Sequence, residues 1–371
     1  MQSYCFGRRK VAAAMGRGFI PRDRHYPDVR QVTSLQQHTA ASGMFHGSSS
    51  DRQSSKSKRR LAKSIRPWIR LSRPGFHLVG LLPFVLGSML AAFYGYPVSF
   101  PVVVLGALGV FLIMLVTYYI GEYFDYEGDC LNEDFNAFSG GSRVLQAGVV
   151  SRRTPLLVAI GLLPAVVTIG FVLQFVFYCG PLTIYLGLLG LCAGIFYSAK
   201  PVQWAYHGLG ELVIGLCYGW LTVNSGYYLQ TGIFSPIGTV MSLPIATSIM
   251  AVIIANEFPD ADADRRVGKT SLVVLLGREV AALTFRILLY LTLAFSFLSA
   301  VCAFSFPYFF LPLILVPAVI VISLESLELP KGKPADVERI CSNAVIFNLL
   351  VTMIPFASLI YEILKRTIFG F

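Results

Sequence analysis

Nine long apolar runs follow one another along the chain and indicate its architecture. They cover, approximately, residues 76–95, 99–120, 154–176, 181–199, 209–230, 236–255, 280–303, 306–324 and 343–364. A run of about 20 apolar residues crosses the hydrocarbon core as a helix, because a helix pairs all of its own backbone polar groups there. A large soluble core would not produce run after run of this length. The pattern predicts an all-α fold, a polytopic membrane bundle of about nine transmembrane helices.

The connections between these runs alternate in character. Four contain no charged residue, near 93–99, 177–181, 231–235 and 304–307. Four others carry nearly all the charge outside the N-terminal tail, at 121–153, 200–208, 256–279 and 325–342. The alternation predicts one polar, functional side of the bundle and one closed side with short turns.

Composition supports a protein embedded in a lipid bilayer. Only 13% of the 371 residues are charged, against roughly 25% in an ordinary soluble domain. The net charge of +10 comes from residues 1–66, which hold 14 Lys/Arg and 3 Asp/Glu, whereas residues 67–371 hold 16 and 17. Nothing indicates the folded basic face that a nucleic-acid partner would require.

The charge divides the chain into a basic tail, residues 1–66, and a nine-helix membrane domain, residues 67–371. Residues 1–60 lack any long apolar run and are predicted to be disordered. Their Arg-rich, acid-poor composition also fits an organelle transit peptide, which would place the protein in an organelle membrane. Alternatively, Met15 or Met44 is the start of a shorter bacterial protein of the cell inner membrane.

Basic residues close to membrane ends favour the cytoplasmic face or its equivalent in an organelle. The basic tail should share the charged side of the bundle, so the active site is expected on the cytoplasmic-equivalent face. An odd number of helices then puts the C-terminus on the opposite face, where Lys365 and Arg366 are a small exception to the rule.

Two short acidic stretches hold much of the membrane domain's negative charge. They read GEYFDYEGD at 121–129 and NEFPDADAD at 256–264. Aligned, they share acidic residues at three matching places: Glu122 with Glu257, Asp125 with Asp260 and Asp129 with Asp264. The common i, i+3, i+7 spacing predicts three carboxylates on one helix face in each stretch. Both follow even-numbered spans, so they should emerge on the same side of the membrane as two halves of one site.

Carboxylates packed this closely need a cation. Oxygen ligands without His or Cys favour a hard divalent ion, Mg²⁺ above all, which keeps coordination positions for water and phosphate oxygens. The pair of stretches therefore predicts a site that holds a diphosphate through Mg²⁺. The alternative is two solvated acidic loops, which would not require the shared spacing.

Three cations on the charged side could accompany a diphosphate. Arg143 follows Gly140-Gly141-Ser142, where glycines let backbone N–H groups approach an anion. Lys200 ends the fourth run, and Lys269 follows the second acidic stretch. Each cation alone could equally be a flanking charge of a membrane helix.

These motifs resemble those of the UbiA superfamily of membrane-embedded aromatic prenyltransferases, whose mark is NDxxDxxxD after the second helix and a related acidic motif after the sixth. The resemblance covers roughly residues 70–365. Supporting pieces are Arg73-Pro74, Tyr197-Ser198 and Gly208-Leu209-Gly210-Glu211. Two departures stand out: Gly121 replaces the usual Asn, and Glu122 and Glu257 replace Asp.

The resemblance implies Mg²⁺-dependent transfer of an isoprenoid chain from a polyprenyl diphosphate to an aromatic acceptor. The six motif carboxylates would hold the metal, Arg143, Lys200 and Lys269 would stabilise the departing charge, and an allylic carbocation would lie near Tyr197, with Tyr118, Tyr119 and Tyr123 as further candidates. Segment 140–148 resembles members that act on 1,4-dihydroxy-2-naphthoate in menaquinone-type quinone biosynthesis.

Other readings stay open from the sequence. The same chemistry serves other acceptors, among them 4-hydroxybenzoate, homogentisate, haem, chlorophyllide or a lipid glycerol. A membrane transporter would also be polytopic, although transport sites tend to lie near the bilayer midplane and these carboxylates cluster at helix ends. The sequence does not indicate chain length of the donor or oligomeric state.

Overall fold

A computed structural model describes residues 65–304 and 308–369, and almost all of the predicted tail, 1–66, lies outside these ranges. Pro67–Phe371 is one compact unit. Within the described residues, seven helices are long and apolar enough to cross a membrane. They are α3 (Pro74–Phe93), α4 (Phe100–Phe124), α6 with η1 (Arg153–Phe171 and Val172–Val176), α10 (Pro236–Glu257), α13 (Arg278–Ala303), η4–α14–η5 (Tyr308–Leu315, Val316–Glu325 and Ser326–Lys331) and α15 (Pro334–Phe369).

The two remaining apolar runs also form helices. The fourth run is α7 (Thr183–Ser198), a shorter apolar helix. The fifth run divides into α8 (Gly210–Ile214), the π-helical η3 (Gly215–Leu221) and α9 (Thr222–Thr231). Every predicted run is therefore helical in the described residues, and the prediction of an all-α membrane bundle is confirmed.

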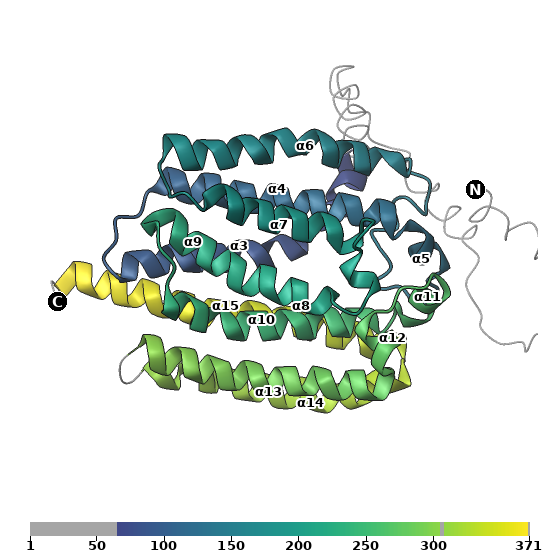
Figure 1. Ribbon diagram of the computed structural model, residues 1–371. Helices are drawn as coiled ribbons and strands as arrows, with labels where there is room; N and C mark the ends of the chain where they lie inside the picture. Colours follow the sequence, from purple (N-terminus) through teal and green to yellow (C-terminus); the bar gives the residue numbers. More distant parts are fainter. Residues whose placement is uncertain (1–64, 305–307, 370–371) are drawn as a thin grey trace, which may run out of the picture. The chain divides into compact units, whose positions relative to one another are not determined.

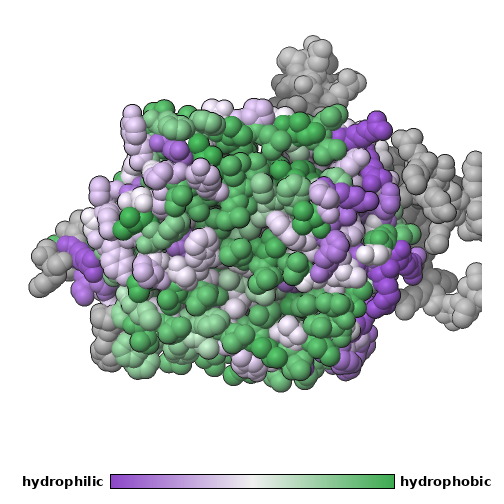
Figure 2. Space-filling model, in the orientation of Figure 1, coloured by the Kyte–Doolittle hydropathy of each residue, from purple (hydrophilic) through white to green (hydrophobic). Residues whose placement is uncertain are grey.

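Four short helices lie in the charged connections. They are α5 (Tyr126–Leu131), η2 (Trp204–Tyr206), α11 (Ala261–Arg266) and α12 (Leu272–Leu276). Figure 1 shows α5, α11 and α12 together at one end of the bundle. In Figure 2 the middle of the visible face is largely apolar and the strongly hydrophilic residues gather at its ends. An apolar middle between polar ends is the surface expected of a protein that spans a bilayer.

The two acidic motifs depart from the predicted geometry. Helix α4 ends at Phe124 and α5 begins at Tyr126, while α10 ends at Glu257 and α11 begins at Ala261. The prediction of one continuous helix face for each carboxylate triplet is therefore wrong. The chain bends inside both motifs, because Asp125 and Asp260 occupy the junctions between a long helix and a short one.

Helices α3 and α10 form the centre of the bundle, with 61% of their most apolar windows buried, against 22% for α4 and 17% for α6 with η1. α3 crosses α9 at two glycines. A Cβ at Gly87 would lie 1.9 Å from the Val223 carbonyl oxygen, and one at Gly226 would lie 1.9 Å from the Phe84 carbonyl oxygen. Ser88 donates a hydrogen bond to the Gly226 carbonyl at 3.1 Å. Small residues let these backbones touch, as in other membrane helix pairs.

Candidate active site

A cavity of about 340 Å³ begins at the acidic motifs and extends between α3, α4, α6, α7, α9 and α10. Its polar end is lined by both motifs together with Arg73 and Lys269. Its apolar part is lined by side chains such as Phe84, Ile169, Leu173, Leu186 and Leu229. The arrangement offers a charged head site continuous with a long apolar compartment.

The first motif supplies Asp125 and Asp129. Ser198 donates a hydrogen bond to Asp125 Oδ2 and Tyr206 donates one to Oδ1, both at 2.9 Å. Burial and the charges of Asp125, Asp260 and Glu122 raise the pKa of Asp129 well above its ordinary value. The surroundings of Asp129 therefore disfavour its ionised form, and a nearby cation would stabilise that form.

The second motif supplies Asp260 and Asp264. Asn132, which directly follows α5, donates a hydrogen bond to Asp260 Oδ1 at 2.5 Å and so joins the two motifs. Burial and the charge of Asp264 raise the pKa of Asp260 to about 7. Lys269 Nζ lies 3.3 Å from Asp264 Oδ2. Burial disfavours the Lys269 ammonium, but the charges of Asp264, Asp125 and Asp260 outweigh it and raise the pKa of Lys269 well above its usual value.

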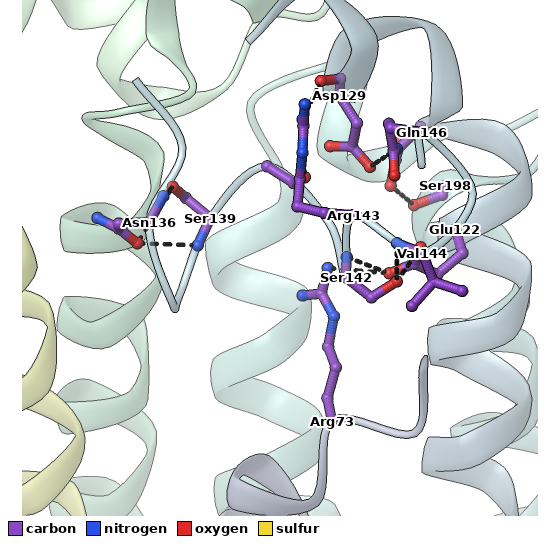
Figure 3. Close-up of polar contacts among 12 residues, drawn as sticks. Arg73, Glu122, Asp129, Asn136, Ser139, Ser142, Arg143, Val144, Gln146 and Ser198 are labelled. Atoms are coloured by element: carbon purple, nitrogen blue, oxygen red, sulfur yellow. Dashed lines mark hydrogen bonds and ion pairs between the residues drawn. The ribbon is translucent and has the colours of Figure 1, made fainter. Parts of the chain in front are cut away.

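Glu122 and Glu257 border the same end of the cavity but are already bonded to other groups of the chain. Glu122 accepts hydrogen bonds from the Ser142 backbone N–H at 2.7 Å and the Ser142 hydroxyl at 2.8 Å, and its Oε1 lies 3.4 Å from Arg73 Nη2. Figure 3 shows Ser142 and the Arg73 guanidinium converging on this carboxylate. The Glu257 carboxyl is hydrogen-bonded to that of Glu211.

The predicted cations separate into two groups. Lys269 lines the cavity, whereas Arg143 and Lys200 are not among its lining residues. Arg143 donates to the Asp129 backbone carbonyl and lies 4.0 Å from the centre of the Phe135 ring, so it supports the loop. Lys200 is exposed. Arg73 lines the cavity and was missed as a site residue, although its position before the first helix was noted.

Aromatic side chains border the polar end. Tyr197 lines the cavity as predicted, and so do Tyr118 and Tyr218, whose hydroxyl oxygens lie 3.3 Å apart. Tyr206 was missed, and its only sequence signal was its place in the charged connection 200–208. Burial and the charge of Asp125 raise the pKa of Tyr206, which keeps its hydroxyl protonated as a donor.

The donor set fits Mg²⁺ without forming a closed cage. In the part of the chain that the structure describes, no group of three His, Cys, Asp or Glu side chains is close enough to hold an ion alone. Mg²⁺ commonly takes one or two protein carboxylates and completes its shell with water and phosphate oxygens. Opposed carboxylates with raised pKa values, as at Asp129 and Asp260, are suited to ions that a diphosphate helps to bind.

Two glycines of the site predict opposite outcomes on substitution. A Cβ at Gly141 would lie 2.2 Å from Asp129 Oδ2, at a φ of +70° that L side chains rarely adopt, so Gly141→Ala should displace Asp129. A Cβ at Gly121 would meet Asp125 Oδ2 at 3.6 Å, which is ordinary contact. We expect Gly141→Ala to lower the rate of the reaction at this site by about 100-fold, and Gly121→Asn to fold and stay active. Initial rates and detergent melting curves test the pair, and equal losses in both variants would contradict it.

Comparisons with known proteins identify relatives of this chain. A model of the UbiA prenyltransferase family matches residues 81–339. The chain is 26% identical over 215 residues to the 1,4-dihydroxy-2-naphthoate octaprenyltransferase of Bacillus subtilis, a stretch covering 57% of this chain and 66% of that protein, slightly less than two thirds. It is 27% identical over 250 residues to the human UbiA prenyltransferase domain-containing protein 1, covering 66% of this chain and 70% of that protein.

Two solved structures share the fold. A UbiA homologue from Archaeoglobus fulgidus, bound to GPP and Mg²⁺, matches with a TM-score of 0.55 and 20% identity, over 78% of this chain and 98% of that one. A homologue from Aeropyrum pernix matches with a TM-score of 0.55 and 19% identity, over 77% and 98%. Since the family model matches well over half of the chain, at residues 81–339, the chain belongs to the UbiA prenyltransferase family.

Proposed function

We propose that the chain transfers an isoprenoid group from a polyprenyl diphosphate to an aromatic acceptor with the help of Mg²⁺. The observation that supports this most directly is the cavity itself, in which Asp125, Asp129, Asp260 and Asp264 border a polar end that continues into an apolar compartment. The shape matches a donor with a diphosphate head and a long hydrocarbon tail. The Archaeoglobus homologue of the same fold binds GPP and Mg²⁺.

The four aspartates would hold Mg²⁺, which when bound neutralises the diphosphate and aids its departure. Lys269 and Arg73, both lining the cavity, supply positive charge where the leaving group becomes more negative. The C1–O bond of the donor breaks, both electrons leave with the diphosphate, and an allylic carbocation remains. An electron-rich ring carbon of the acceptor forms the new bond. The ring then becomes aromatic again by passing a proton to the diphosphate or to water, or by releasing the carboxylate of that carbon as CO₂.

The chain also has to protect the carbocation from water. Tyr118, Tyr197 and Tyr218 border the cavity near the acidic motifs, and their ring faces can stabilise a passing cation. Glycines such as Gly109, Gly187 and Gly190 line the apolar compartment and leave width for the isoprenoid tail. A Cβ at Gly187 would have no neighbour within 4 Å.

For the acceptor we propose 1,4-dihydroxy-2-naphthoate, in menaquinone-type quinone biosynthesis. The name of the Bacillus relative supports this choice. So does segment 140–148, which the structure places beside the first motif through Ser142 and Gln146. The same pocket chemistry would serve another aromatic acceptor, such as 4-hydroxybenzoate or homogentisate.

The membrane and the orientation belong to the proposal as well. The charged connections and the site share one end of the bundle, which we assign to the cytoplasmic-equivalent face, in the cell inner membrane or an organelle membrane. The orientation can be tested with single cysteines introduced into the connections 121–153 and 231–235 of the protein in sealed vesicles. A membrane-impermeant thiol reagent should label one of the two connections from outside and not the other.

Product analysis tests the function. Membranes containing the protein are incubated with isoprenoid diphosphates of several lengths and with 1,4-dihydroxy-2-naphthoate, 4-hydroxybenzoate or homogentisate, with and without Mg²⁺. Mass spectrometry should find a prenylated naphthoate product that requires Mg²⁺. Prenylation of a different acceptor would correct the acceptor, and the absence of any prenylated product would refute the function.

The raised pKa of Asp260, about 7, predicts that protons and Mg²⁺ compete for its carboxylate. Because its ordinary value is 3.8, the metal-free folded protein gains stability from the bound proton and loses it as pH rises through about 7. Mg²⁺ replaces that proton, so we expect it to raise the melting temperature more at about pH 8 than at about pH 6. Melting curves in detergent test this, and Asp260→Asn should weaken the difference. An equal Mg²⁺ effect at both pH values would contradict it.

A further inference from the structure

The loop Gly140–Arg143 connects the two acidic motifs. A Cβ at Gly141 would fall 2.2 Å from Asp129 Oδ2, so the loop backbone lies directly against this carboxylate. Arg143 donates to the Asp129 backbone carbonyl. A Cβ at Gly140 would lie 3.1 Å from Asn132 Nδ2, and Asn132 donates to Asp260 Oδ1 in the other motif. The position of this loop therefore decides where Asp129 and Asp260 lie relative to each other.

Glu122 fixes that loop. Its residue is only 2% exposed, and its two oxygens accept the backbone N–H and the hydroxyl of Ser142 at 2.7 and 2.8 Å. Arg73, 3.4 Å away, offsets its charge. The negative charge of a buried carboxylate with two close donors and a cation is already balanced. Most of its lone pairs are occupied by these partners and are not free to bind a metal.

In the second motif, Glu257 also contacts backbone that follows the motif, but its neighbour is a second carboxyl, that of Glu211. The Glu257 carboxyl is hydrogen-bonded to the Glu211 carboxyl, and its Oε2 lies 3.5 Å from the Val273 backbone N. Glu211 accepts the Leu272 N–H at 3.0 Å. These backbone groups begin α12, directly after the segment 265–271 that carries Lys269. The first acidic residue of each motif thus contacts backbone that follows that motif, at Ser142 in a loop for Glu122 and at the start of α12 for Glu257.

We propose that Glu122 and Glu257 are positioning residues, and that metal binding falls to the four aspartates alone. Glu122 holds the loop 140–143, and Glu257, together with Glu211, holds the start of α12 behind Lys269. The inference rests on the proposed function and narrows the six ligands expected from the sequence to four. It also gives a reason for glutamate at these two positions, since the longer side chain reaches a neighbouring loop.

The test uses the full chain in detergent and compares Glu122→Gln, Glu122→Ala and Ser142→Ala. The Gln carbonyl can still accept from Ser142 but carries no charge for a metal, so we expect Glu122→Gln to keep activity within about tenfold and to need the same Mg²⁺ concentration for half-maximal rate. Glu122→Ala should lose about 100-fold, since it leaves buried donors unpaired. Combining it with Ser142→Ala should add little, because both changes break the same contact.

Asp125→Asn is the matched control for a metal ligand and should shift the Mg²⁺ requirement. The proposal is overturned if Glu122→Gln shifts that requirement as far as Asp125→Asn does, or if the Glu122→Ala and Ser142→Ala losses are additive. Amide hydrogen exchange of peptide 139–146 provides a readout without turnover, in which Glu122→Ala should speed exchange and Glu122→Gln should not. If the parent protein shows no prenyl transfer, the proposed function is refuted. If amide exchange of peptide 139–146 is unchanged in Glu122→Ala, the positioning role of Glu122 is refuted, whatever the activity.

Discussion

Replacing Asp125 or Asp260 by asparagine is expected to lower Mg²⁺-dependent prenyl transfer by at least about 1,000-fold, because a bound metal contributes several kcal/mol to stabilising the departing diphosphate. Asparagine keeps the shape of the side chain, so the contacts to Ser198 and Asn132 can largely persist. The variants should therefore insert and melt near the parent's temperature while losing turnover.

The matched control is Asp262→Asn in the second motif. Its carboxylate has 55% side-chain exposure and pairs with Arg265 and Arg278 outside the cavity, so we expect a rate within about threefold of the parent. Single-turnover assays with radiolabelled donor at several Mg²⁺ concentrations separate metal binding from chemistry. Near-parental turnover by both Asp125→Asn and Asp260→Asn would refute the proposed metal site.

Lys269→Ala should have the second largest effect, a loss of about 100- to 1,000-fold in kcat, because it removes the cation that pairs with Asp264 and lines the proposed diphosphate site. Lys269→Arg keeps the charge and should recover part of the rate. Arg266→Ala, an exposed change in the same segment, provides the control for local disruption. Steady-state kinetics with the donor varied will show whether the loss is in kcat, as expected for a group that acts on the transition state.

Lys200→Ala completes this series. The sequence suggested equal roles for both lysines, whereas the structure leaves Lys200 exposed and outside the cavity lining. We therefore expect a rate within about threefold of the parent for Lys200→Ala. A loss as large as that of Lys269→Ala would mean that both lysines act on the diphosphate.

The helices could be predicted because membrane burial depends on long local runs. Segment 280–303 became α13, Arg278–Ala303, with a difference of two residues at its start. The meeting of the two motifs also followed from the alternation of loops. The i, i+3, i+7 spacing did not reveal the helix breaks at Asp125 and Asp260, although Pro259, which has no backbone N–H, is a local signal for the second. The contacts of these two carboxylates with Tyr206 and Asn132 come from elsewhere in the chain, so local spacing could not predict them.

The sequence alone could not choose among the cations for a similar reason. The glycines before Arg143 suggested that it binds phosphate. In the structure its guanidinium donates a hydrogen bond to the Asp129 backbone carbonyl and packs on the Phe135 ring. Arg73 is separated from Glu122 by 49 positions in the sequence, and only the folded bundle brings the two together at the cavity. Charge in a loop can be read from sequence, but the direction of a long side chain depends on tertiary packing.

The crossing of α3 and α9 affects how relatives of this chain should be compared. Gly87 and Gly226 have no room for a Cβ, and neither lines the cavity. Glycine would be retained at both positions across enzymes with different acceptors, since any larger residue would push two backbones apart. Agreement at such positions indicates common ancestry and carries no information about substrate. Relatives are better sorted by cavity positions outside the motifs such as Gly187, where a side chain has space to differ.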